Sequence, residues 1–187
     1  MKKATRKTPL RQAMIDTSSL QSSISDGLGA IQSTHKDYFD ESIKTVFADS
    51  LELDEAVKKG REQENRWDYL LGHTSSGEIV AVEPHSAKQD EVSTVIKKRT
   101  AAREHLKGHL RDGVRIYKWL WVASGKVHFA DTEKTKRLLD QNGVEFVGRK
   151  ISSKHLPPAA SPAPAPAVGA AAAAGKKIGT ARARKGK

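Results

Sequence analysis

The sequence predicts an α/β domain in which a mixed β-sheet is flanked by helices. Two apolar, strand-like segments, 67–72 and 78–83, are joined by the turn-forming residues 73–77. The segment 88–111 follows, with apolar residues at helical spacing, and 114–123 then alternates aromatic and other residues as a strand does. A hairpin followed by a helix and a further strand is the order typical of an α/β domain with a mixed sheet.

The remaining elements are shorter. Residues 38–47 fit a short amphipathic helix and a strand equally well. Asp49 with Glu52 three residues later resembles a helix-capping pair, so we expect a helix over 49–60. After 114–123 we expect a turn at Ser124-Gly125, a short strand at 127–129, a helix capped by Asp131 and extending to Leu139, and a last strand at 144–147.

Charge and composition divide the chain into three parts. Residues 1–12 hold five Lys or Arg and no acid, 151–187 hold seven and no acid, and the remaining 21 bases are balanced by all 22 acids. We therefore expect a basic, mostly irregular leader over 1–33, the α/β domain over 34–155, and an Ala/Pro-rich linker with a disordered basic tail over 156–187. The basic arms are attracted to any polyanion, or they serve solubility alone.

The composition also excludes several classes of function. With no cysteine, the chain has neither disulfides nor thiolate catalysis nor Cys-ligated zinc. It lacks both a run of about 18 strongly apolar residues and an apolar core after its basic start, so we expect no membrane span and no secretory signal. These features predict an intracellular, cytoplasmic protein with no membrane partner.

The predicted hairpin brings two acids together. A loop centred between Ser75 and Ser76 places Leu71 opposite Val80 on one face and Asp68 opposite Glu83 on the other. Directly opposed residues have Cβ atoms about 4.5–5.5 Å apart, and like charges there are destabilising. A divalent cation would offset that repulsion, because Mg²⁺ and Mn²⁺ favour oxygen ligands.

The neighbourhood of these acids supports two interpretations. His85 lies two residues past Glu83 and projects to the same side, where it could hold a water or a metal. In the alternative, the acids lie at a solvated end of the sheet and pair with Arg66 or Lys88.

This arrangement resembles the PD-(D/E)XK nuclease superfamily, which includes restriction enzymes and Holliday-junction resolvases. The resemblance covers residues 50–123: a short helix, a hairpin with Asp68 on one strand and the Glu83-Pro84-His85 tripeptide on the next, then a helix and a strand. It implies a restriction-endonuclease-like core, in which Asp68 and Glu83 hold Mg²⁺, or Mn²⁺, and a phosphodiester bond is cut by metal-assisted hydrolysis.

The sequence departs from the family pattern where the water-activating lysine is expected. His85 stands in that position, and no proline precedes Asp68. The resemblance implies that His85 itself, or an amine returned from the following helix by Lys88, fills the role. The family's further acid on the first helix matches Glu52 or Glu55.

Basic residues suggest a nucleic-acid partner. On the long helix the cations that recur every four residues are Arg99, Arg103, Lys107 and Arg111. In the tail the candidate phosphate-binding cations are Lys176, Lys177, Arg182, Arg184 and Lys185. The tail residues would form an arm that binds nucleic acid independently of sequence. The helix residues form either a ridge that contacts successive phosphates or a face that is simply exposed to water.

The sequence thus yields a first hypothesis and an alternative. The first is a nuclease-like protein that acts on DNA with Mg²⁺ or Mn²⁺. The alternative is a catalytically inactive module of the same fold, which binds nucleic acid or a protein partner through its basic arms.

Overall fold

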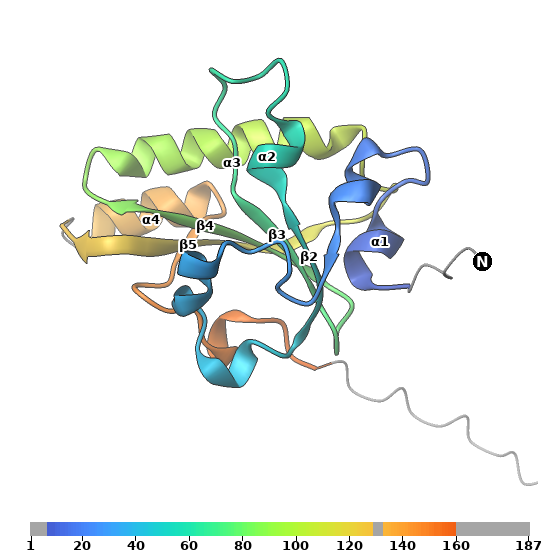
Figure 1. Cartoon of the computed structure of the whole chain (residues 1–187). Coiled ribbons are helices and arrows are strands. Elements are labelled where there is room, and N and C mark those ends of the chain that lie inside the picture. Colours follow the sequence, from blue (N-terminus) through green and yellow to red (C-terminus); the bar gives the residue numbers. More distant parts are fainter. Residues whose placement is uncertain (1–6, 129–132, 160–187) are drawn as a thin grey trace, which may run out of the picture.

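The computed structural model describes residues 7–128 and 133–159, which build a six-stranded mixed sheet flanked by helices (Figure 1). The sheet confirms the predicted fold class. The strands are β1 (Ser25–Asp26), β2 (Phe47–Glu52), β3 (Tyr69–His73), β4 (Ile79–Ala87), β5 (Ile116–Val127) and β6 (Glu145–Phe146). They lie side by side in chain order, antiparallel from β1 to β4 and parallel from β4 to β6.

Helices connect the strands and flank the sheet. The α-helices are α1 (Pro9–Ala13), α2 (Leu53–Val57), α3 (Glu91–Lys107) and α4 (Glu133–Gln141). The 3-10 helices are η1 (Ser19–Ser23), η2 (Ser33–Tyr38), η3 (Glu41–Ile43) and η4 (Ser153–His155). The long α3 crosses from the end of β4 to the start of β5, which makes these two strands parallel (Figure 1).

The hairpin register is confirmed. Leu71 pairs with Val80 and Leu70 with Ala81, as the loop centred between Ser75 and Ser76 requires. Alternation along β3 and β4 then sends one set of apolar side chains to each face of the sheet.

Each face of the sheet carries its own core. On one face, the α-helices bury their apolar side chains against Leu70, Ala81 and Trp119. On the other, Leu71 and Val80 pack against residues from the segments 31–47 and 151–156, which contain η2, η3 and η4. The sheet is therefore covered on both sides, and this is why β3 and β4 are apolar almost throughout.

The predicted boundary between the leader and the domain, at residue 33, was wrong. Residues 7–33 pack into the domain, with Leu10, Met14 and Leu20 buried in the helical face of the core. Order begins well before Tyr38 because a buried carboxylate, Asp49 of β2, accepts hydrogen bonds from the backbone N–H groups of Leu10 and Arg11 and anchors α1.

Other boundaries also differ from prediction. Asp49 and Glu52 belong to strand β2, and neither side chain caps the helix that follows; only Leu53–Val57 of the expected helix 49–60 is helical. The helix expected over 88–111 is α3, which ends before Gly108. The turn expected at Ser124-Gly125 is absent, because β4 continues far enough to pair with β5 as far as Val127.

Two predicted features lie outside the described residues: the helix cap at Asp131 and the basic tail beyond residue 159. In the described part of the chain, no helix has both the length and the apolar character that crossing a membrane requires.

Candidate functional site

The two predicted acids meet near the N-terminal end of β3. Asp68 immediately precedes β3, and its backbone N–H donates a hydrogen bond to Glu83 Oε2 of β4 at 3.0 Å. The Glu83 side chain is fully buried, whereas that of Asp68 is 21 % exposed. The site therefore opens to solvent through Asp68.

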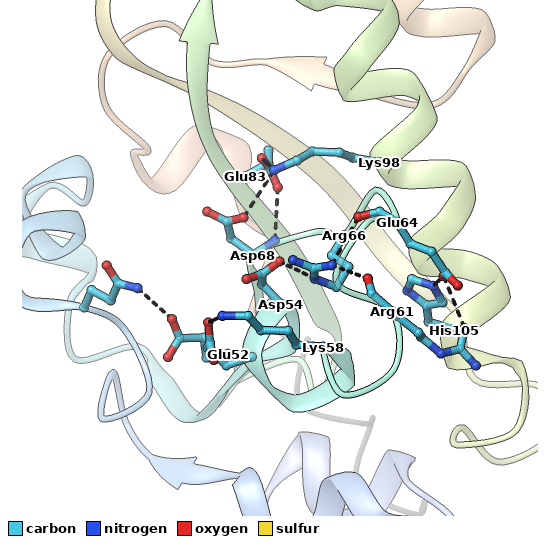
Figure 2. Close-up of polar contacts among 12 residues, drawn as sticks. Glu52, Asp54, Lys58, Arg61, Glu64, Arg66, Asp68, Glu83, Lys98 and His105 are labelled. Carbon is cyan, nitrogen blue, oxygen red and sulfur yellow. Dashed lines mark hydrogen bonds and ion pairs between the residues drawn. The ribbon is translucent and has the colours of Figure 1, made fainter.

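A lysine that the sequence analysis did not select completes the cluster. Lys98 reaches down from α3, and its Nζ lies 3.4 Å from Asp68 Oδ1 and contacts Glu83 Oε1 more closely (Figure 2). The ammonium thus lies between the two carboxylates and offsets the repulsion that the hairpin register creates.

The charges of the cluster are coupled. Burial, reinforced by the nearby charge of Asp68, raises the pKa of the Glu83 carboxyl well above its ordinary value. Burial also opposes the charged form of Lys98, but the two carboxylates outweigh it and raise the pKa of this amine. The amine is therefore held as an ammonium, and Glu83 takes up a proton more readily than an exposed glutamate does.

His85 lies beside the acids but is fixed by another partner. Its Nδ1 is 3.5 Å from Glu83 Oε1, and its Nε2 is 3.0 Å from Glu91 Oε2 at the start of α3. The structure thus brings the predicted His85 to the edge of the cluster, bridging two glutamates.

Lys88 does not reach the acids. It is exposed in the loop before α3, and Glu91 is the carboxylate that its charge influences. The placement expected for Lys88 was wrong: the amine from the helix is Lys98, because the middle of α3, and not its start, lies over Asp68 and Glu83.

The two candidates for an additional acid lie outside the cluster. Glu52, at the end of β2, accepts a hydrogen bond from the Gln32 side chain at 2.8 Å. Glu55 pairs with Lys58 at 2.9 Å. The structure therefore brings neither Glu52 nor Glu55 into contact with Asp68 or Glu83.

Three contacts hold the second half of the loop between α2 and β3. Arg66 Nε donates to Asp54 Oδ1 at 2.8 Å, and Glu64 Oε2 lies 2.8 Å from His105 Nε2 of α3 (Figure 2). The Asp68 carbonyl accepts a hydrogen bond from the Leu53 N–H at 2.7 Å. These contacts fix the backbone that carries Asp68.

The two carboxylates are the kind of oxygen ligands that a hard cation takes. Mg²⁺ usually keeps several waters and is bound through one or two carboxylates. Within residues 7–128 and 133–159, no three His, Asp or Glu side chains gather as a metal-ligand group. A cation here would rest on Asp68 and Glu83, with oxygens of water or phosphate as its further ligands.

The basic stripe of α3 is brought together only in part. Arg99, Arg103 and Lys107 lie on α3, whereas Arg111 follows the end of the helix. All four nevertheless line one hollow of about 570 Å³ between α3 and the start of β5. The predicted tail residues Lys176, Lys177, Arg182, Arg184 and Lys185 lie outside the described residues.

Lys98 could have been found from the sequence. It lies three residues after Val95 and four before Ala102, both buried, so it occupies the apolar face of α3. A lysine at such a position needs a buried partner, and the hairpin register supplies two. In comparisons with known proteins, no family model, no curated protein and no solved structure matched the chain.

Proposed function

We propose that the chain is a metal-dependent nuclease that cuts DNA by phosphodiester hydrolysis, with a restriction-endonuclease-like core. One observation carries the proposal: Asp68, just before β3, and Glu83, in the neighbouring β4, converge with Lys98 at a site that is partly open to solvent. Two acids and an amine are the groups that the PD-(D/E)XK resemblance implies for metal-assisted phosphodiester hydrolysis.

The order of the elements supports the same proposal. The antiparallel strands β2, β3 and β4 are followed by α3 and by β5, which is parallel to β4. The acids stand at the second and third of these strands, as in the PD-(D/E)XK resemblance. In this chain the amine comes from the helix at Lys98, and His85 occupies the position that lysine usually holds.

Each residue then has a distinct task. Asp68 and Glu83 would hold Mg²⁺ or Mn²⁺, and the bound cation would supply a nucleophilic water at neutral pH and stabilise charge on the phosphate. Lys98 Nζ, held as an ammonium, would donate hydrogen bonds to a phosphate oxygen or orient the attacking water. His85 would position Glu83, because it lies between Glu83 and Glu91.

A specific observation favours the alternative of binding without cleavage. The Lys98 ammonium already lies between both carboxylates, and Glu83 is fully buried. A cluster that is satisfied in this way needs no cation. The protein would then bind nucleic acid, or a protein partner, through its basic residues, and Lys98 would serve only to neutralise the acids.

DNA cleavage separates these two functions. Supercoiled plasmid is incubated with the full chain and Mg²⁺ or Mn²⁺, and nicking is followed by gel electrophoresis. We expect wild type to nick the plasmid and Asp68→Asn/Glu83→Gln to lose at least a hundredfold in rate, because both metal ligands are gone.

The matched control is Glu41→Gln/Glu133→Gln, which removes two exposed acids outside the cluster and should change the rate less than twofold. Equal nicking by wild type and the site variant would exclude this site. An absence of nicking by wild type with either metal would favour the binding module. A DNA substrate fits the cytoplasmic location that the composition predicts.

A further inference from the structure

A basic hollow lies along one flank of α3. Its volume is about 570 Å³, and its walls are the second half of α3 and residues 110–119. Five cationic side chains but a single acid, Asp112, line it. The cations are Arg99, Arg103, Lys107, Arg111 and Arg115.

Two of these cations are committed to neighbours. Arg111 donates to Asp16 Oδ1 at 2.6 Å and to the Gln12 carbonyl at 3.0 Å. Lys107 lies 2.7 Å from Glu104. Arg111 therefore helps to shape the hollow, and the Lys107 pair is exposed enough to exchange its partner.

Arg103 and Arg115 are the available cations. Both are exposed, and within the described residues neither has a carboxylate at ion-pair distance. They face the same hollow from different elements, since Arg103 lies on α3 and Arg115 just before β5. Two guanidinium groups from different elements, each without a carboxylate partner, are available as donors to an anion.

Arg99 forms the inner end of the hollow. Its guanidinium lies 5.5 Å above the Trp119 ring, and its Nε is buried with no hydrogen-bond partner in the described part of the chain. Burial lowers the pKa of Arg99, and the neighbouring Arg103 guanidinium lowers it further. An anion bound between Arg99 and Arg103 would relieve this crowding of positive charge.

The spacing of the cations matches a nucleic-acid strand. Arg99, Arg103 and Lys107 are four residues apart, so at about 1.5 Å rise per residue they span ~12 Å of helix. One strand of B-form DNA carries a phosphate about every 3.4 Å along the axis, so three or four phosphates fit that length. The row begins at Arg99, the residue after the Lys98 of the carboxylate cluster.

We propose that this hollow, with Arg103 and Arg115 as its principal contacts, binds the backbone phosphates of the DNA that enters the Asp68–Glu83–Lys98 site. The inference deepens the proposed function and rests on it for the identity of the ligand. Sequence-independent contacts of this kind fix the position of a strand and read no bases.

The test is direct binding without cleavage. The full chain is titrated in EDTA against a fluorescent 20-base-pair DNA duplex, and anisotropy gives the affinity between 50 and 200 mM salt. We expect Arg103→Glu/Arg115→Glu to bind at least tenfold more weakly than wild type at 100 mM salt. Losing two phosphate contacts should also reduce the slope of log affinity against log salt by about 1.8.

Lys97→Glu/Lys136→Glu is the matched control. It changes the net charge equally at two exposed lysines that do not line the hollow, so it should weaken binding less than threefold and keep the slope. Equal weakening by both variants would overturn the proposal, because only the overall charge would then matter. Polyglutamate that binds as tightly as the duplex and is equally sensitive to Arg103→Glu/Arg115→Glu would also overturn it and assign the hollow to an acidic protein.

The outcome remains distinct from that of the nuclease test. If the hollow variant loses affinity while wild type nicks no plasmid, the hollow stands and hydrolysis fails. If wild type nicks plasmid through Asp68 and Glu83 but the hollow variant binds normally, hydrolysis stands and the hollow fails.

Discussion

At the scale of single residues, Glu83 shows how the fold accommodates a buried acid. Its Oε2 accepts a hydrogen bond from the Asp68 backbone N–H, and its Oε1 contacts the Lys98 ammonium and lies near His85 Nδ1. Removing one partner of a buried ion pair costs about 3–5 kcal/mol, but replacing the whole pair by apolar residues is often neutral. Stability alone therefore gives no reason for a charged cluster here, whereas the proposed hydrolysis would give one.

A second buried titratable residue, His155, leads to a prediction on pH. Its side chain is buried, and its Nδ1 accepts a hydrogen bond from the Ser152 N–H at 3.0 Å. Burial lowers the pKa of His155, so the unfolded chain binds a proton at a higher pH than the folded chain. The stability that the neutral imidazole contributes is present above the ordinary pKa of histidine and is lost as the pH falls through the lowered value.

We predict that wild type is less stable at pH 5.5 than at pH 7.5, and that His155→Asn reduces this loss. The asparagine side chain can accept the same hydrogen bond but does not titrate. Urea unfolding at both pH values measures the difference. His128→Asn, at an exposed histidine, is the control and should keep the wild-type loss. An unchanged loss in His155→Asn would refute this account of the residue.

At the scale of elements, a close contact between β2 and β3 holds the N-terminal segment. Asp49 faces Gly72 across the two strands, and its carboxylate caps α1 through the N–H groups of Leu10 and Arg11. A Cβ atom at Gly72 would lie 2.0 Å from Asp49 Oδ1 and 2.8 Å from Pro9 Cβ. Only glycine at position 72 therefore leaves room for α1 to be anchored in this way.

We predict that Gly72→Ala lowers the free energy of unfolding by about 3 kcal/mol, near the upper end of typical overpacking costs. It should also expose residues 7–26 to proteases, because α1 loses its anchor. Chemical denaturation and limited proteolysis measure the two effects. Gly125→Ala, where no heavy atom lies within 4 Å of the new Cβ, should behave as wild type. Normal stability in Gly72→Ala would contradict this packing.

Elements whose pattern is local were predictable, and those that depend on distant partners were not. The β3–β4 hairpin followed from alternation and turn chemistry, and so did the meeting of Asp68 and Glu83. Residues 49–52 were predicted as the start of a helix, because their strand conformation depends on pairing with β1 and β3, which are distant in the sequence. Lys98 was predictable only in part, because its position on the apolar face of α3 is a local pattern, whereas its partners depend on where α3 crosses the sheet.

At the scale of the whole molecule, α3 joins the two proposed functional regions. Lys98 points from it to the carboxylates (Figure 2). The next residue, Arg99, lines the basic hollow. One rigid helix therefore sets the distance between the proposed phosphate contacts and the acids. Rigid elements hold such geometry better than loops do.

Binding of Mn²⁺ to the full chain, followed by electron paramagnetic resonance, tests the central claim that Asp68 and Glu83 form a cation site. We predict one bound ion in wild type and at least tenfold weaker binding in Asp68→Asn. Lys97→Met, at an exposed lysine beside Lys98, should match wild type. Mn²⁺ binding that is unaffected by Asp68→Asn would contradict the site.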